Sequence, residues 1–342
     1  MELTRVGRAR AAGSDRELMR LVAELYYLRD LTQPEIARLT GFSVSKVSRL
    51  LAQARAGGIV RISVEPPAVV EPGVAGAIAE RFGVEVHLTP GGDPHPSVAA
   101  RLCGLGAADV VARALPQAGV VGITGGYTIG ALVSAMPRLE RPGLTVVPLV
   151  GGWDTRNPHL DCNELARRFA DRLSADVRFL HAPGMLDSEE TKLALLRDSG
   201  IAATTRYWER LALAIVGTSG GPLARPGYGT VMDRLDDAGR RRLAEKEVVG
   251  DLGGHLFRAD GSFVDDEWSR RTIAIPIELL RRTPRIVLVA AGSNKVEAIV
   301  GALRSGLVHV LVTDPPTAQA VLQLVAKAEA AAGRGRAVAA PR

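Results

Sequence analysis

Residues 32–55, TQPEIARLTGFSVSKVSRLLAQAR, predict two short helices joined by a tight turn. Thr32 offers an N-cap oxygen to the first helix, and Glu35 stands three residues later as its capping-box partner. Gly41 suits the turn because glycine tolerates a positive φ, and Ser43 is placed to cap the second helix. Two short helices in this arrangement are typical of a helix-turn-helix DNA reader.

The second of these helices carries an apolar stripe that predicts its inward face, formed by Val44, Val47, Leu51 and Ala54. Short polar and basic side chains lie elsewhere on the helical wheel, where they can reach phosphates and base edges in the major groove. An ordinary helical hairpin with a solvated basic face is the alternative, but cap, turn, stripe and polar set agree on DNA binding. The residues predicted to contact DNA are Thr32, Gln33, Ser43, Ser45, Lys46, Ser48 and Arg49.

Further elements flank this pair of helices. Residues 17–29 have apolar side chains at helical spacing and predict a first packing helix. Beyond Gly57 and Gly58, residues 59–64 (IVRISV) alternate like a short strand, which suggests a small wing. Two prolines at 66 and 67 then favour an extended linker. The sequence therefore predicts a winged helix-turn-helix domain over residues 1–65 and a linker over 66–74.

The charge distribution agrees with this assignment. The chain of 342 residues has a formal net charge of +6, and residues 1–64 contribute +5 of it. A basic excess confined to one part of a chain is the electrostatic footprint of polyanion binding. The hydrophobic content of 46% and the charged content of 23% are those of a globular protein with room for two or three domains.

Several other classes of protein are not supported by the composition. No apolar run approaches the ~20 residues of a membrane span, and the basic start MELTRVGRAR has no apolar signal core, so we expect a cytoplasmic protein without membrane contact. Cys103 and Cys162 are too few for a disulfide framework or a four-ligand zinc site and are expected to pack. His181 and His255 lack metal-ligand spacing. No metal and no cofactor is predicted.

From about residue 74 the pattern changes to β-branched apolar runs that alternate with helical segments. Such nearly continuous apolar runs predict strands covered on both faces, hence a mostly parallel α/β sheet. Ligands of these sheets bind beyond the carboxyl ends of the strands. The predicted strands are 84–88, 120–124, 144–150, 177–181, 213–217, 285–290 and 308–313.

The loop after the second predicted strand resembles a phosphate cradle. Thr124 is followed by Gly125, Gly126, Tyr127 and Thr128, and then by a helix from about Ile129. Glycines let the backbone approach a ligand, and a helix N-terminus favours an anion. The motif is neither GxGxxG nor a P-loop, and a plain tight turn is an equally good interpretation.

Other predicted strand ends also carry polar or glycine residues: Gly151 and Gly152, Asp251 in a further glycine-rich site, and Lys295. Their number favours one shared pocket. Lys295 stands at a predicted helix N-terminus, where the helix dipole disfavours a cation and a bound anion would offset the cost; a solvated lysine is the alternative. Asp251 can accept hydrogen bonds from sugar hydroxyls, or it is an Asx turn residue.

Over residues 17–325 the chain resembles transcriptional regulators of the SorC family. The resemblance rests on LTQPEIARLTGFSVSKVSRLLAQARAGGIVRI, GITGGYT, VGDLGGHLFRADG and the block from Arg270 to Asp314. It implies a winged helix-turn-helix followed by a Rossmann-like domain that is similar to sugar-phosphate isomerases. It further implies a sugar effector, usually phosphorylated, and assembly into dimers or tetramers. By position, residues 125–128 and Lys295 would hold the phosphate, and Asp251 would face the sugar hydroxyls.

We therefore expect a DNA-binding regulator whose binding to double-stranded operator DNA is controlled by a sugar or sugar-phosphate effector. The effector domain is predicted over residues 75–327 and a disordered tail over 328–342, and the protein is expected to be a homodimer or homotetramer. The alternative is a sugar-phosphate isomerase or deaminase with a DNA-binding head, in which Lys295 could form a Schiff base. No catalytic residue is predicted, because no paired carboxylate–histidine spacing supports that alternative.

Overall fold

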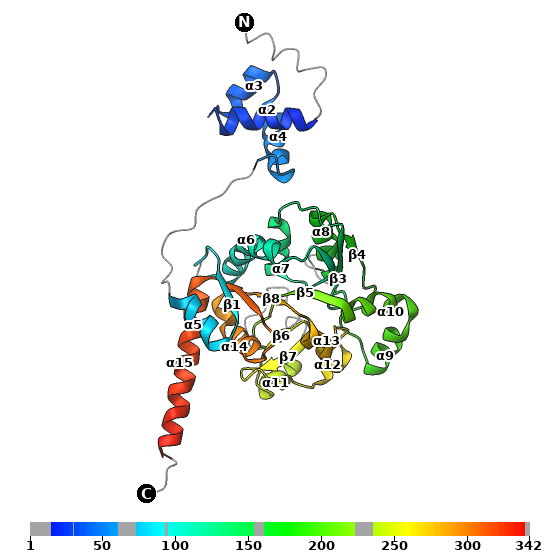
Figure 1. The fold of residues 1–342 in the computed structure, drawn as a ribbon, viewed down its shortest axis with the longest axis vertical. Helices are drawn as coiled ribbons and strands as arrows, with labels where there is room; N and C mark the ends of the chain where they lie inside the picture. Colours follow the sequence, from blue (N-terminus) through cyan, green and yellow to red (C-terminus); the bar gives the residue numbers. More distant parts are fainter. Residues whose placement is uncertain are drawn as a thin grey trace. The chain divides into compact units, whose positions relative to one another are not determined.

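The chain divides into two compact units, residues 1–65 and 66–342. The computed structural model describes residues 15–29, 31–60, 73–92, 95–153, 161–222 and 235–338, and side chains up to residue 330 (Figure 1). Each unit has its own hydrophobic core.

In its described residues, the first unit is a bundle of three helices: α2 (Asp15–Tyr27), α3 (Gln33–Thr40) and α4 (Val44–Ala56). Its core gathers Val22 of α2, Ile36 of α3 and the inner face of α4. The inward stripe predicted for α4 is partly wrong. Val44 is 45% exposed, and Leu50, at 6%, takes part in the core. Val44 is the first residue of the helix, so the core does not extend far enough to cover it.

The predicted caps and turn are confirmed. The carboxylate of Glu35 accepts hydrogen bonds from the Thr32 amide at 2.8 Å and the Thr32 hydroxyl at 2.6 Å. Gly41 has a φ of +72°, and the Ser43 hydroxyl accepts from the Lys46 amide at 3.2 Å. Most of the predicted wing strand and the prolines at 66 and 67 lie outside the described residues, and Ile59 and Val60 pack against the core of the unit.

The second unit is built on a seven-stranded sheet in the order β1-β9-β8-β5-β2-β3-β4, and every pairing is parallel. All seven predicted strand positions contain a strand. These pairings confirm the predicted parallel sheet. Side chains alternate along its strands between two apolar cores, one on each face of the sheet. The strands are β1 (Glu85–Leu88), β2 (Ala118–Ile123), β3 (Gly143–Pro148), β4 (Asp176–Val177), β5 (Leu211–Val216), β8 (Ile286–Val289) and β9 (Val310–Thr313).

Helices cover both faces of this sheet (Figure 1). The core on one face joins the sheet to α6 (Pro96–Ala114), α7 (Tyr127–Ala135) and α8 (Cys162–Leu173). The core on the other face joins it to α5 (Gly73–Phe82), α10 (Ser199–Thr205), α13 (Ile277–Arg282), α14 (Val296–Arg304) and α15 (Pro315–Val338). The remaining helical segments are α9 (Glu189–Arg197), η3 (Arg206–Arg210), α11 (Asp237–Glu245), α12 (Glu267–Arg271) and η5 (Ser293–Lys295).

The strand predicted over 177–181 is much shorter in the structure, where β4 ends at Val177. The backbone at Leu180 pairs instead with a side chain. The Asn163 amide accepts from the Leu180 N–H at 2.8 Å and donates to its carbonyl at 3.1 Å. A side-chain amide thus takes the place of a neighbouring strand, and a single sequence does not reveal such a partner.

A hairpin outside the main sheet was not predicted. Strands β6 (Val248–Leu252) and β7 (His255–Arg258) pair antiparallel. They are joined by Gly253 and Gly254, whose φ values are +58° and +88°. A two-residue hairpin turn with both φ values positive is of the kind that glycine pairs favour. The sequence was interpreted there as a glycine-rich loop.

The predicted disordered tail is also different in the structure. Helix α15 continues through residues 328–338, and residues 339–342 lie outside the described part of the chain. The segment is rich in alanine, which has the highest intrinsic helix propensity of the residues. The glycines and arginines that suggested disorder are therefore carried in a helix that starts within the folded unit.

Candidate functional site

The predicted phosphate loop connects β2 to α7 at the carboxyl edge of the sheet. The Thr124 hydroxyl accepts a hydrogen bond from the Gly217 amide at 3.1 Å and so ties the ends of β2 and β5 together. Gly126 has a φ of +108° and is the N-cap of α7, and among the described residues no side chain caps this helix. The first backbone N–H groups of α7 are therefore open to an anion at the positive end of the helix dipole.

Lys295 lies beside the first turn of α7. Its Nζ is 3.5 Å from the Oγ1 of Thr128, and Thr128 is itself buried. The residue is the N-cap of α14, as the sequence predicted. Burial lowers the pKa of its ammonium, while the nearby Cys103 and the carboxylate of Asp251 act in the opposite direction. Water and the helix dipole therefore do little to stabilise the protonated form of Lys295.

Asp251 projects from β6 toward this group. Its Oδ1 accepts hydrogen bonds from the Ser219 hydroxyl at 2.5 Å and from the Ser219 amide at 3.3 Å. Asp251 is also close enough to Lys295 to favour its charged form. Ser219 was not among the predicted site residues. Its position three residues after β5 is the sequence signal that could have found it.

The backbone N–H groups of Gly151 and Gly152 are used in hydrogen bonds within the fold and are not free to bind a ligand. The Gly151 N–H donates to the Ile273 carbonyl at 2.9 Å, and the Gly152 N–H donates to the Ala182 carbonyl at 2.8 Å. Trp153, next in the chain, stacks on Trp268 with ring centroids 5.8 Å apart and planes at 10°. Because both amides are used, a ligand could meet these glycines only through their Cα atoms or carbonyl oxygens.

Tyr127 is the first residue of α7 and is 43% exposed. Of the predicted effector site, the structure brings together residues 124–126, Thr128 and Lys295, with Asp251 nearby. The side chain of Tyr127 lies at the solvent-facing border of this group.

The titratable groups around the loops are not arranged as nucleophiles. Burial raises the pKa values of both Cys103 and Cys162 to about 12, so both thiols are neutral at physiological pH. The His255 Nε2 is 2.7 Å from the Ile275 carbonyl oxygen, and burial lowers the pKa of the imidazole. Among the described residues, no group of three or more His, Cys, Asp or Glu side chains could hold a metal ion.

Helix α6 rests on both loops of the site. A Cβ added to Gly104 would lie 2.2 Å from the Thr128 carbonyl oxygen, so α6 and α7 touch backbone to backbone. A Cβ on Gly292, in the loop that carries Lys295, would lie 3.2 Å from the carbonyl oxygen of Pro96 at the start of α6. Small residues at these points allow the close approach.

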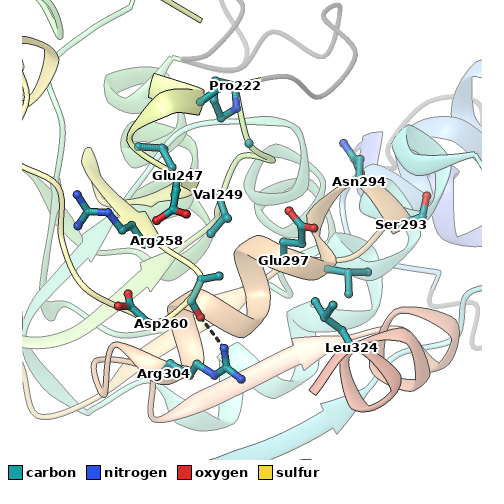
Figure 2. A pocket seen from close by; sticks show the side chains of 15 residues that line it. Pro222, Glu247, Val249, Arg258, Asp260, Ser293, Asn294, Glu297, Arg304 and Leu324 are labelled. Atoms are coloured by element: carbon teal, nitrogen blue, oxygen red, sulfur yellow. Dashed lines mark hydrogen bonds between the residues drawn. The ribbon is translucent and has the colours of Figure 1, made fainter. Parts of the chain in front are cut away.

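A cavity of about 840 Å³ lies beside the site, between the β6–β7 hairpin, the start of α14 and α15 (Figure 2). Its lining includes Ser293 and Asn294 but neither Lys295 nor the phosphate loop. Both guanidinium groups in it are engaged, because Arg258 donates to the Lys246 carbonyl and Arg304 to the Ala259 carbonyl. Figure 2 shows three carboxylates there, from Glu247, Asp260 and Glu297. An acidic lining suits a phosphate poorly, and the strand-end loops remain the better effector site.

The predicted DNA-contacting side chains gather at the start of α4. The Ser43 and Ser45 hydroxyls lie 3.0 Å apart, and the Lys46 ammonium lies 4.1 Å from the centre of the Phe42 ring. Arg49 is exposed and makes no hydrogen bond or ion pair among the described residues. Ser48 lies on α4 and is exposed. The two other predicted residues belong to α3, where Thr32 is the exposed N-cap and Gln33 is the half-buried first residue.

A three-helix DNA-reading unit and a separate parallel α/β unit with polar loops at its strand ends define the class, which is a DNA-binding regulator with a ligand-binding domain. Residues 74–323 match the Sugar-bind family, described as "Putative sugar-binding domain", and the chain belongs to this family. The resemblance to SorC-type regulators is confirmed.

The relatives agree with this class along nearly the whole chain. The sorbitol operon regulator of Klebsiella pneumoniae is 28% identical over 90% of this chain and 98% of its own. The deoxyribonucleoside regulator of Bacillus subtilis is 29% identical over 90% of this chain and 99% of its own. The crystal structure of the full-length Klebsiella regulator SorC superposes with a TM-score of 0.68 at 26% identity, covering 91% of this chain and all of that one. Among the described helices, none has the length and apolar character of a membrane span.

Proposed function

We propose that this protein represses or activates transcription according to whether a phosphorylated sugar occupies the strand-end site. The observation that carries the proposal is the meeting of an uncapped helix N-terminus, the Thr128 hydroxyl and the half-buried ammonium of Lys295. Each of these groups favours an anion, and a phosphate would satisfy all three at once.

The remaining polar groups suit the sugar. Asp251 has one carboxylate oxygen bound to Ser219, and its second oxygen can accept from a sugar hydroxyl. The tyrosine at position 127 lies at the border of the site, where its ring would limit the size of the sugar. We assign no catalytic residue, because the two cysteines are neutral and the imidazole of His255 is held by a backbone carbonyl.

The DNA-reading surface is proposed at the N-terminal end of α4, which would enter the major groove. Arg49 and Lys46 would contact phosphates or guanine, and Ser45 a base edge. Val44 adds an apolar group there, since it is exposed at the first position of α4, and an apolar side chain fits the methyl group of thymine.

We further propose that residues 1–65 bind operator DNA, residues 75–327 bind the effector and residues 66–74 link them. A helix-turn-helix reader placed on a two-fold operator acts as an even-numbered assembly, so a homodimer or homotetramer is proposed. The proposed location is the cytoplasm, where operator DNA and phosphorylated sugars are both present.

A thermal-shift screen tests the effector class. Pentose and hexose phosphates are compared with the same sugars without phosphate, each at equal concentration. Stabilisation by the phosphorylated compounds alone supports the proposal, because a ligand that binds the folded state raises the melting temperature. Equal stabilisation by the unphosphorylated sugars would contradict the proposed phosphate site.

Binding of Arg49→Ala to operator fragments selected with the wild-type chain tests the DNA surface. If Arg49 contacts a phosphate, the slope of log affinity against log salt falls by about 1. Arg20→Ala is the matched control, because Arg20 has the same charge, lies on α2 rather than on α4 and pairs with Glu24 of its own helix. Equal losses in the two variants would show a general charge effect and contradict the assignment.

A further inference from the structure

Helix α6 carries an apolar stripe on its solvent-facing side. Val98, Leu102 and Leu105 are 39%, 37% and 38% exposed. They are spaced at i, i+4 and i+7 and therefore lie on one face of the helix. The opposite face of α6 is buried in the core through Cys103, Ala107 and Val111. A regular apolar stripe on the exposed face of a helix marks a contact surface.

Two charged residues border this stripe. Arg101 and Asp109 are both exposed and lie four residues before and four residues after Leu105. Among the described residues, neither makes a hydrogen bond or an ion pair. A basic and an acidic side chain are thus left unpaired at equal distances from the centre of the stripe.

We propose that α6 is the interface between two copies of this chain, packed antiparallel about a two-fold axis at Leu105. In such an interface, residue i meets residue j and residue j meets residue i. Arg101 then faces Asp109 of the partner subunit, and Asp109 faces the partner's Arg101. The apolar stripe is covered by its own copy, with Val98 over the small Ala112 of the partner subunit.

The charge pattern distinguishes this occupant from an unrelated partner. A copy turned by a two-fold axis supplies both opposite charges from the same helix, whereas a foreign surface would have to match each charge separately. The expectation of an even-numbered assembly rests on the proposed function, whereas the choice of α6 rests on the stripe and its two charges alone. Because α6 touches both loops of the effector site, ligand and partner subunit would act on the same helix.

Charge reversal of the full-length protein tests the pairing. Sedimentation equilibrium measures the dissociation constant of the assembly. Arg101→Asp and Asp109→Arg each place like charges opposite one another twice, and each should weaken association roughly tenfold or more. The double variant R101D/D109R restores both pairs and should return the constant to near the wild-type value. A double variant that is no tighter than the single variants would overturn the proposal.

Substitutions at the axis give a second, independent test. Leu105→Glu should halve the size of the assembly, whereas Leu193→Glu, on α9 and 43% exposed, should leave it unchanged. Leu105→Cys should form a disulfide with its own copy under mild oxidation, and Leu193→Cys should not. The native Cys103 and Cys162 are buried and do not interfere.

Wild-type protein that stays monomeric at every concentration would overturn the proposal. So would an assembly that is unaffected by Leu105→Glu and not cross-linked through Leu105→Cys. DNA binding by Arg49→Ala is measured separately, so failure of the interface and failure of the DNA assignment are distinguishable.

Discussion

Replacing Lys295 with methionine should change the free and the ligand-bound protein in opposite directions. Methionine keeps most of the apolar stem and removes the ammonium that burial and the dipole of α14 disfavour. Relief of that dipole interaction should stabilise the free protein by about 1 kcal/mol. In a domain of this size, that corresponds to a rise in melting temperature of roughly 2–4 °C.

The same change should weaken phosphate binding. One charge-assisted hydrogen bond is lost, which costs about 1.5–3 kcal/mol and corresponds to a roughly 10- to 150-fold rise in Kd. Thermal shift measures the first effect and isothermal titration calorimetry the second, with the best sugar phosphate from the screen. Lys327→Met is the control, because Lys327 is exposed on α15.

The pH dependence of stability tests independently whether the Lys295 ammonium destabilises the free protein. The pKa of Lys295 in the folded protein lies below its unfolded value, so its charge costs stability at neutral pH. That cost is relieved as pH rises from the folded pKa to the unfolded pKa of about 10.4. The difference in free energy of unfolding between the variant and the wild type should therefore shrink over that range. A variant whose free form is less stable than wild type, or whose Kd is unchanged, would refute the reasoning.

Three other predictions concern stability. Ser43→Ala removes the cap of α4 and should destabilise the DNA-reading unit by about 1 kcal/mol in urea unfolding. Gly254→Ala should cost about 1 kcal/mol or more, because φ is +88° and the new Cβ would lie 2.8 Å from the Ala274 Cβ; Gly76→Ala, in open space on α5, should not destabilise. Burial lowers the pKa of His255, so wild-type stability should fall as pH drops from about 6.5 toward that pKa, and His255→Gln should remove this slope.

Regular, local patterns in the sequence predicted most of the fold. Thr32, Gly41 and Ser43 act through neighbours within four residues, and so their caps and turn were correctly predicted. The seven apolar runs predicted the parallel sheet because strands covered on both faces need no long-range information to be recognised. The β6–β7 hairpin was missed because β6 contains Gly250 and because its turn was interpreted as a ligand loop.

Contacts between distant residues account for the remaining differences. Strand β4 is short because Asn163, on a neighbouring helix, takes up the backbone at Leu180. The amides of Gly151 and Gly152 pair with carbonyls more than 25 residues away. Ser219 was overlooked because its role depends on Asp251, 32 residues along the chain. Val44 follows the helical period of the core but stands one turn beyond its edge.

The stacked pair of Trp153 and Trp268 provides an optical reporter within the effector domain. The chain has three tryptophans, and the third, Trp208, is buried with its indole N–H bonded to the Pro148 carbonyl. Residues 1–65 contain none, so tryptophan emission originates from the ligand-binding unit alone. Two parallel indoles 5.8 Å apart should couple as an exciton pair in the ultraviolet. Because Trp153 directly follows Gly152, the circular dichroism of this pair would record movement of that strand-end loop without any added label.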